Sequence, residues 1–168
     1  MSAQANPRLA LRPMLPADAP LLAEIFRESV LDLTGDDYSA EQQEAWAAKA
    51  DDAKEFSDKL AKQLTLVATL EGSPVGFASL KGRDEIDMLF VHPAASRYGA
   101  ATMLIDALEK LAAARGARKL TADVSDSAQE FFKRRGFVAQ TRNTVPRGDE
   151  WLANTTMEKK LVAKERAT

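Results

Sequence analysis

The sequence predicts an α/β fold built on one mixed, mostly antiparallel central sheet with helices on both faces. Three strand-like runs, at residues 64–70, 74–80 and 86–91, follow one another without a helix between them, which argues against a doubly wound parallel sheet. A later strand–helix–strand unit requires a parallel, right-handed crossover. One sheet accommodates both features if most of its neighbouring strands are antiparallel and one pair is parallel.

The first third of the chain is predicted to hold one strand and then three helices. Residues 8–14 alternate between apolar and basic positions, as in a half-buried strand. Pro16 marks a helix start, and apolar residues then recur at helical spacing. Residues 39–42 have the S-x-x-Q spacing of a capping box, which predicts a second helix that carries Trp46. A third, polar helix is expected over residues 52–62.

The next block is predicted to be an antiparallel meander of three strands. These are the runs named above, which are rich in β-branched, aromatic and other apolar residues. Residues 71–73 and 82–84 lie between them and contain glycine, so each segment is a turn signal.

The C-terminal part of the chain is predicted to alternate between helices and strands. The helix after the meander ends at Gly116, a residue that favours a left-handed cap. Residues 120–124 form a buried strand, and the capping-box spacing of residues 127–130 opens another helix. Residues 137–145 and 151–161 close the fold as a pair of strands.

Composition excludes several kinds of site. The chain has 168 residues, a net charge of −2, no cysteine and one histidine. Without cysteine there is no disulfide framework, no thiolate nucleophile and no Cys-based zinc or iron–sulfur site, and one histidine makes a two-histidine metal site hard to build. We therefore expect no metal. The near-neutral charge gives no reason to expect nucleic acid or a membrane surface as a partner.

The chain is expected to form a single domain over residues 1–168, with a frayed tail from about residue 162. Its first seven residues carry no apolar run of signal length, and no run of about eighteen apolar residues occurs anywhere. A cytoplasmic location is the expectation.

The segment from Val91 to Leu104 ends a strand, turns through small residues and opens a helix. The first N–H groups of a helix lack internal partners and carry partial positive charge, so they can hold a phosphate. Gly99, Ala100 and Ala101 leave room for it. The segment is neither a P-loop, which needs Gly-Lys-Ser or Gly-Lys-Thr, nor a three-glycine dinucleotide fingerprint. Close packing of a helix on a sheet also explains small residues here.

Two motifs that lie in the same order favour the phosphate interpretation. The run Leu89-Phe-Val91-His-Pro93, followed by Ser96-Arg-Tyr-Gly99-Ala-Ala101, resembles the signature of the GNAT superfamily of acyl-CoA-dependent N-acyltransferases. That signature is an apolar-x-Val-x-Pro strand end and Q/R-x-x-G-x-G/A at a helix start. The family's second motif, N-x-x-A-x-x-F-Y ending in Gly-Phe, is matched in spacing by Ser125, Ala128, Phe131, Phe132 and Gly136-Phe137. The resemblance runs from about Leu9 to Leu161.

The resemblance implies the GNAT fold and an N-acetyltransferase that uses acetyl-CoA as cosubstrate. The acetyl group would move directly, in a ternary complex, to a primary amine on a small molecule or a peptide. Pantetheine would enter between the strand that ends at Val91 and the strand over residues 120–124, and an N–H near Leu89 or Phe90 would polarise the thioester carbonyl. A monomer or a homodimer would both be compatible. The residues implied to bind the cofactor are Leu89, Phe90, Val91, Ser96, Arg97, Tyr98, Gly99, Ala100, Ala101, Ser125, Ala128, Phe131 and Phe132.

Three positions depart from the family pattern. Ser96 replaces the usual Gln or Arg, so that Arg97 would have to take over the side-chain contact to the diphosphate, and Ser125 replaces the usual Asn. Phe132 stands where many members carry a tyrosine that protonates the leaving thiolate. These losses leave open a second function, a non-catalytic acyl-CoA-binding sensor or regulatory domain.

A carboxylate is needed to take the proton of the acceptor amine, because an alkylammonium with a pKa near 10.4 is almost fully charged at pH 7. Glu85 and Asp87 are the candidates, and counting with a period of two places both on the face of Leu89 and Val91. Glu85 also matches the position of the catalytic glutamate in some family members. Both residues could instead be solvated, in a turn or at a strand edge.

Two aromatic residues near the N-terminus are candidates for the acceptor side of the site. The segment that carries Tyr38 and Trp46 resembles one found in a bacterial subgroup of the superfamily, where it covers the acceptor cleft. Tyr38 could donate a proton in place of the missing tyrosine, and Trp46 could form a wall. Core packing is the alternative role for Trp46.

Overall fold

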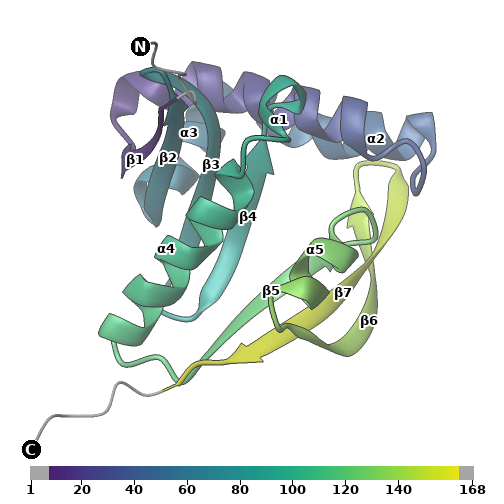
Figure 1. The fold of residues 1–168 in the computed structure, drawn as a ribbon. Helices are drawn as coiled ribbons and strands as arrows, with labels where there is room; N and C mark the ends of the chain where they lie inside the picture. Colours follow the sequence, from purple (N-terminus) through teal and green to yellow (C-terminus); the bar gives the residue numbers. More distant parts are fainter. Residues whose placement is uncertain (1–7, 163–168) are drawn as a thin grey trace, which may run out of the picture.

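A computed structural model describes residues 8–162 as a seven-stranded mixed sheet in the order β1-β2-β3-β4-β5-β7-β6, with helices on both faces (Figure 1). This confirms the predicted fold class. The strands are β1 (Leu9–Pro13), β2 (Leu64–Leu70), β3 (Ser73–Lys81), β4 (Glu85–Val91), β5 (Lys119–Ser125), β6 (Val138–Arg147) and β7 (Glu150–Lys160). The α-helices are α1 (Ala19–Leu33), α2 (Ala40–Ala47), α3 (Ala53–Ala61), α4 (Ala100–Ala114) and α5 (Gln129–Arg134). Short 3-10 turns are η1 (Pro16–Asp18), η2 (Ala48–Ala50) and η3 (Pro93–Ala95).

The predicted meander and crossover are both present in the sheet. β1 to β4 pair antiparallel in chain order, and the chain passes through three helices between β1 and β2. β4 and β5 are parallel and are connected through α4, as a right-handed crossover requires. β5, β7 and β6 pair antiparallel. The sheet therefore has one parallel junction, in its middle.

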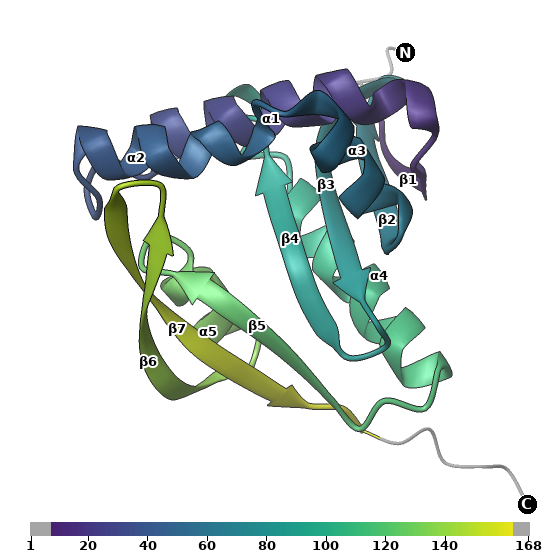
Figure 2. The same ribbon diagram turned by 180° about the vertical axis from the view of Figure 1, so that it is seen from behind.

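That junction is short. β4 and β5 share only two Cα partner pairs, Glu85 with Thr121 and Ile86 with Ala122. Beyond these pairs the two strands diverge towards their carboxyl ends, as Figures 1 and 2 show from opposite sides. The second half of β4 consequently has a neighbour on only one side, β3.

The apolar core is divided by the sheet into two clusters. One cluster lies on the face covered by α4 and α5 and includes Leu104, Leu108 and Phe132. The other lies on the face covered by α1, α2 and α3 and includes Phe26 and Phe56. Because side chains of β4 pack into both clusters, β4 is held in place even where it no longer pairs with β5.

A β-bulge in β4 changes which residues share a face. Ser79 of β3 opposes Met88 while Leu80 opposes Ile86, so Asp87 is the extra residue. Ile86 consequently packs in the α4 cluster and Met88 in the α1 cluster, which strict alternation would not allow. The prediction that Asp87 shares a face with Leu89 and Val91 is therefore wrong: those two pack on the α4 side, and Asp87 lines a cavity together with Met88.

The two predicted capping boxes have different outcomes. At the start of α2 the Gln42 N–H donates to Ser39 Oγ at 3.1 Å and the Ser39 N–H donates to Gln42 Oε1 at 2.8 Å, as predicted. The box predicted over residues 127–130 is wrong, because α5 begins one residue later with Ala128 as its N-cap. The Ser127 hydroxyl instead donates to Asp37 Oδ2 at 2.8 Å, a contact between segments far apart in the sequence.

Gly76 of β3 is expected to tolerate no side chain. A Cβ there would lie 3.0 Å from the Phe90 carbonyl oxygen and 3.1 Å from Val91 Cγ2. Gly76→Ala should lower the free energy of unfolding by about 1–3 kcal/mol, measured by urea denaturation, because β4 has to shift. Gly35→Ala is the matched control, since its Cβ would meet its nearest atom at 3.7 Å, an ordinary contact. Equal stability of the two variants would contradict this prediction.

No helix within residues 8–162 is long and apolar enough to cross a membrane. Across the same residues, no group of three or more His, Asp or Glu side chains is arranged to hold a metal ion.

Candidate functional site

The divergence of β4 from β5 opens a cavity of about 300 Å³ that lies between α1 and Trp46 on one face of the sheet and the start of α4 and α5 on the other. Its lining is mostly apolar and comes from α1, β4, the start of α4 and the segment from the end of β5 into α5. Nine of the thirteen predicted cofactor-binding residues line it, including the two phenylalanines of α5. They are Leu89, Phe90, Val91, Ser96, Ala101, Ser125, Ala128, Phe131 and Phe132.

The backbone of β4 offers hydrogen-bonding groups to the gap. The His92 N–H donates to the Val75 carbonyl at 2.7 Å, and hydrogen-bonded pairs alternate along an antiparallel ladder. By this register the pair Phe77–Phe90 is also hydrogen-bonded, so that the Phe90 N–H points to β3. The N–H and C=O groups of Leu89 and Val91 then point to the side that β5 has left. Of the two amides that were candidates for polarising a thioester carbonyl, the geometry favours that of Leu89.

The N-terminus of α4 provides free backbone donors. Gly99 is its N-cap, with φ at +83°, and a Cβ on Gly99 would meet nothing within 4 Å. Within the described chain the N–H groups of Arg97, Gly99, Ala100 and Ala101 donate to no protein acceptor, whereas that of Tyr98 donates to the Ala95 carbonyl at 3.2 Å. Several free donors beside open space suit the diphosphate of coenzyme A. The side chains of Arg97 and Tyr98 are exposed.

A second cavity, of about 160 Å³, lies on the α1 and α3 side of β4. It shares three lining residues with the first cavity: Trp46, Phe90 and Ser125. Its other lining residues are Phe26, Tyr38, Lys49, Lys59, Asp87, Met88, Asp123, Val145, Arg147, Leu152, Ala153 and Asn154. The two cavities therefore adjoin near the end of β4.

Trp46 forms part of the wall between the cavities. Its ring packs edge-on against those of Tyr38 and Phe90, with centroids 5.5 Å and 6.2 Å apart. The predicted wall and the alternative of core packing therefore describe the same contacts.

The two candidate carboxylates are in different surroundings. Asp87 lines the second cavity and accepts a hydrogen bond from Gln63 Nε2 at 3.1 Å, and Lys59 Nζ lies 3.4 Å from the same carboxylate oxygen. Glu85 lies at the start of β4, where β4 still pairs with β5, and lines neither cavity. Of the two, only Asp87 can meet an amine in the second cavity.

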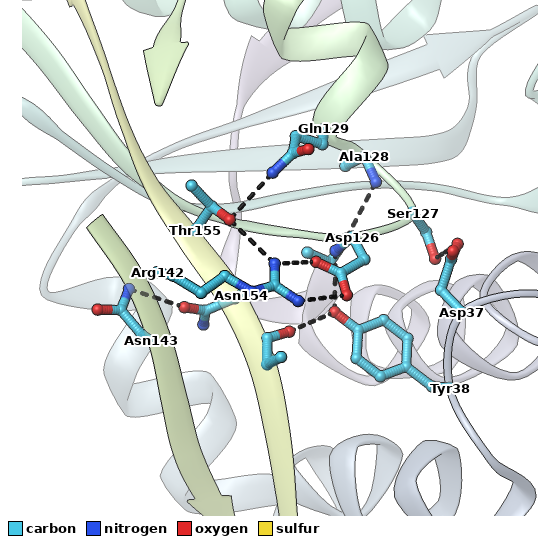
Figure 3. A network of polar contacts seen from close by, with 12 residues as sticks. Asp37, Tyr38, Asp126, Ser127, Ala128, Gln129, Arg142, Asn143, Asn154 and Thr155 are labelled. Atoms are coloured by element: carbon cyan, nitrogen blue, oxygen red, sulfur yellow. Dashed lines mark hydrogen bonds and ion pairs between the residues drawn. The ribbon is translucent and has the colours of Figure 1, made fainter. Parts of the chain in front are cut away.

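Tyr38 joins the chain segments that bound both cavities (Figure 3). Its hydroxyl donates to the Ala153 carbonyl at 2.7 Å and accepts the Asp126 N–H at 2.9 Å. Arg142 Nη2 donates to Asp126 Oδ2 at 2.9 Å, which ties the same turn to β6. Burial raises the pKa of Tyr38 above its usual value, so the hydroxyl stays protonated. With both its donor and its acceptor functions used, this hydroxyl positions the turn after β5.

Tyr38→Phe should lower the free energy of unfolding by about 1–3 kcal/mol, since the Asp126 N–H and the Ala153 carbonyl both lose a buried partner. Thermal unfolding measures this loss. Tyr98→Phe is the matched control, because Tyr98 is 49 % exposed. A stability unchanged by Tyr38→Phe would contradict the positioning role.

Four charged residues of the second cavity were not predicted from the sequence: Lys49, Lys59, Asp123 and Arg147. They come from η2, α3, β5 and the end of β6, which no local pattern connects. For Lys49 a signal existed, because it follows Trp46 by three residues and thus shares its helix face.

Comparison with known proteins finds similarity to acetyltransferases. Residues 34–161 match the family model described as an acetyltransferase (GNAT) domain. The chain is 35 % identical over 152 residues to the uncharacterized N-acetyltransferase YafP of Escherichia coli K12. The alignment covers 90 % of this chain and 96 % of YafP.

Two solved structures extend the comparison. The GCN5-related N-acetyltransferase structure from Rhodopseudomonas palustris is 60 % identical, with a TM-score of 0.90 over 96 % of this chain and 99 % of that one. The PaiA N-acetyltransferase of Thermoplasma acidophilum, solved in complex with coenzyme A, is 20 % identical, with a TM-score of 0.76 over 91 % of this chain and 99 % of that one. The second likeness concerns the fold alone.

Proposed function

The chain belongs to the GNAT family of acetyltransferases, and on this premise we propose that it moves an acetyl group from acetyl-CoA directly to a primary amine while both substrates are bound. Membership confirms the predictions of the GNAT fold, of an N-acetyltransferase and of acetyl-CoA as cosubstrate. The direct transfer, the amine and the roles of individual residues are the proposal. A single domain over the whole chain and a cytoplasmic location belong to it as well.

The observation that carries the proposal is the pair of adjoining cavities along the second half of β4. The first cavity contains the features that suit coenzyme A: free amides before α4, unpaired backbone groups on β4 and an apolar lining. The second contains a carboxylate, Asp87, that suits an amine. Their junction at Trp46, Phe90 and Ser125 allows transfer without an enzyme-bound acetyl group, which also agrees with the absence of cysteine.

When bound, acetyl-CoA supplies an activated acyl thioester. The N–H groups of Arg97, Gly99, Ala100 and Ala101 bind diphosphate oxygens, and the Leu89 N–H donates to a carbonyl oxygen in the gap. Asp87, directly or through one water, takes the proton from the acceptor's ammonium.

Phe132 has no proton to give to a leaving thiolate. Ser125 is the only hydroxyl among the described residues that lines both cavities. Its Oγ accepts the Ala128 N–H at 3.2 Å, which leaves its own hydrogen free to donate. We assign to Ser125 the relay of a proton to the leaving thiolate: its hydroxyl would give its proton to the sulfur while it takes the proton that the attacking nitrogen loses when the amide forms. To Tyr38 we assign the positioning of the turn that follows Ser125.

The test is the release of free coenzyme A from acetyl-CoA with a panel of amines. Thiol reagents suit the assay, because the protein itself carries no cysteine. Thiol release that depends on the amine, together with an intact mass that shows no acetyl-enzyme without amine, supports direct transfer. Calorimetric binding of coenzyme A without turnover of any amine would instead favour the sensor function.

A further inference from the structure

The second cavity holds more positive than negative side chains. Lys49, Lys59 and Arg147 line it, against Asp87 and Asp123. They reach it from η2, α3 and the β6–β7 hairpin, so three separate elements direct cations into one small space.

Both carboxylates of this cavity are already engaged. Asp87 is paired with Lys59 at 3.4 Å and with Gln63. Asp123 Oδ1 accepts the Thr156 hydroxyl at 2.6 Å. Among residues 8–162, neither Lys49 nor Arg147 lies within ion-pair distance of a carboxylate, and the Arg147 guanidinium donates only to the carbonyl of its neighbour Pro146 at 2.8 Å. Two cations are left without an anion.

The surroundings of Lys49 make its positive charge unfavourable. Lys49 is an exposed residue, but protein atoms around its ammonium group partly desolvate it and lower its pKa to about 8, and the charges of Arg147 and Lys59 add to this lowering. The negative charges of Asp87 and Glu55 raise the pKa of Lys49, but not enough to restore its usual value. An anion bound beside Lys49 would stabilise its charged form.

We infer that the acceptor amine carries an anionic group, a carboxylate or a phosphate, which Lys49 and Arg147 bind while the amine lies at Asp87. This inference rests on the proposed function and deepens it. A cavity of about 160 Å³ is of the size that holds a ligand as small as benzene, so the anionic group and the amine belong to one small molecule. Arg147 can bind anionic oxygens in bidentate fashion, and Lys49 adds a point charge.

The experiment compares amines in pairs that differ only in the anionic group. Suitable pairs are amino acids and their amides, ω-amino carboxylates and alkylamines, and phosphoethanolamine and ethanolamine. We expect the anionic member to have the higher kcat/KM by roughly tenfold or more. The carboxylate pairs and the phosphate pair separate the two sources of anionic oxygen.

Variants then locate the effect. Lys49→Met and Arg147→Met should each raise KM for the anionic amine roughly tenfold or more with little change in kcat, and Arg147→Lys should recover part of the loss. Lys62→Met is the matched control, because Lys62 is an exposed cation at the end of α3 that does not line the cavity.

A binding measurement keeps the inference independent of turnover. N-acetylglycine and N-acetylglycinamide, titrated by calorimetry, resemble a product with and without a carboxylate. The carboxylate should bind more tightly, and its affinity should fall as pH rises through about 8, where Lys49 loses its proton, but not in Lys49→Met.

The outcomes separate this inference from the proposed function. Turnover of neutral amines as fast as anionic ones would overturn the inference and leave the acetyltransferase intact. A collapse of kcat in Lys49→Met for all amines, with KM unchanged, would make Lys49 the general base and would also overturn it. Failure of every amine, with binding of N-acetylglycine retained, would count against the proposed function alone.

Discussion

Asp87→Asn is expected to lower kcat/KM for acetyl transfer roughly 100- to 1,000-fold, the range that a positioned general base contributes. Asp87 lines the acceptor cavity beside Met88 and Phe90, and the other carboxylate of the cavity, Asp123, accepts a hydrogen bond from the Thr156 hydroxyl. The amide oxygen of Asn can still accept the hydrogen bond from Gln63, so the fold around the bulge should persist. The rate of acceptor-dependent thiol release measures the loss, and unchanged thermal unfolding checks the fold.

The matched control is Glu85→Gln, which removes one carboxylate from the same strand. Glu85 lies where β4 and β5 still pair and lines neither cavity, so the rate should change by less than about threefold, since remote surface changes have small effects. The reverse result, with Glu85→Gln inactive and Asp87→Asn active, would return the base to the residue that the family resemblance favours. An unchanged rate in both variants would remove Asp87 and Glu85 from the role of general base.

Ala101→Glu is expected to weaken the binding of coenzyme A roughly 30- to 150-fold. Ala101 is the second residue of α4 and lines the cofactor cavity. A carboxylate there would lie near the diphosphate, and two like charges about 5 Å apart at an effective dielectric constant near 20 repel by about 3 kcal/mol, less after screening by salt. Calorimetry with coenzyme A measures the change.

The same substitution should not harm the fold. A glutamate in the first turn of a helix interacts favourably with the helix dipole, so thermal unfolding without ligand should be unchanged or slightly higher. Ala114→Glu, at the exposed last position of α4, adds the same charge to the same helix and should leave coenzyme A affinity within about twofold. Equal affinity in the two variants would show that the diphosphate is bound elsewhere.

The order of the secondary-structure elements was predictable because each of them has a local signal. Examples are the period of the apolar stripe in α4, the capping box at Ser39 and the glycines that end α4 and α5. The capping box predicted at Ser127 failed for a non-local reason. The hydroxyl of Ser127 has a better partner in Asp37, which lies 90 residues away in the sequence.

The cofactor side of the site was also predictable, since most of its residues belong to two short motifs. The second cavity was predictable only in part: Tyr38, Trp46 and Asp87 were candidates, but its other charged residues were not. Its lining comes from segments between Phe26 and Asn154, brought together only by the sheet. The bulge at Asp87 was also unpredictable from local sequence. One extra residue in β4 changes which face of the sheet the following side chains occupy, and no local pattern marks where that residue is inserted.

The unpaired stretch of β4 has a consequence for how this enzyme tolerates change. The donors along Leu89 and Val91, like those before α4, are main-chain N–H groups, so no substitution other than one by proline deletes them. If these groups bind the cosubstrate as proposed, a replacement such as Ser96 leaves its main-chain contacts in place. Under the inference that Lys49 and Arg147 bind the acceptor, selectivity would instead depend on individual side-chain charges, which single mutations can change. The cosubstrate part of the proposed site thus depends on main-chain geometry, whereas the acceptor part depends on side chains that mutation can replace.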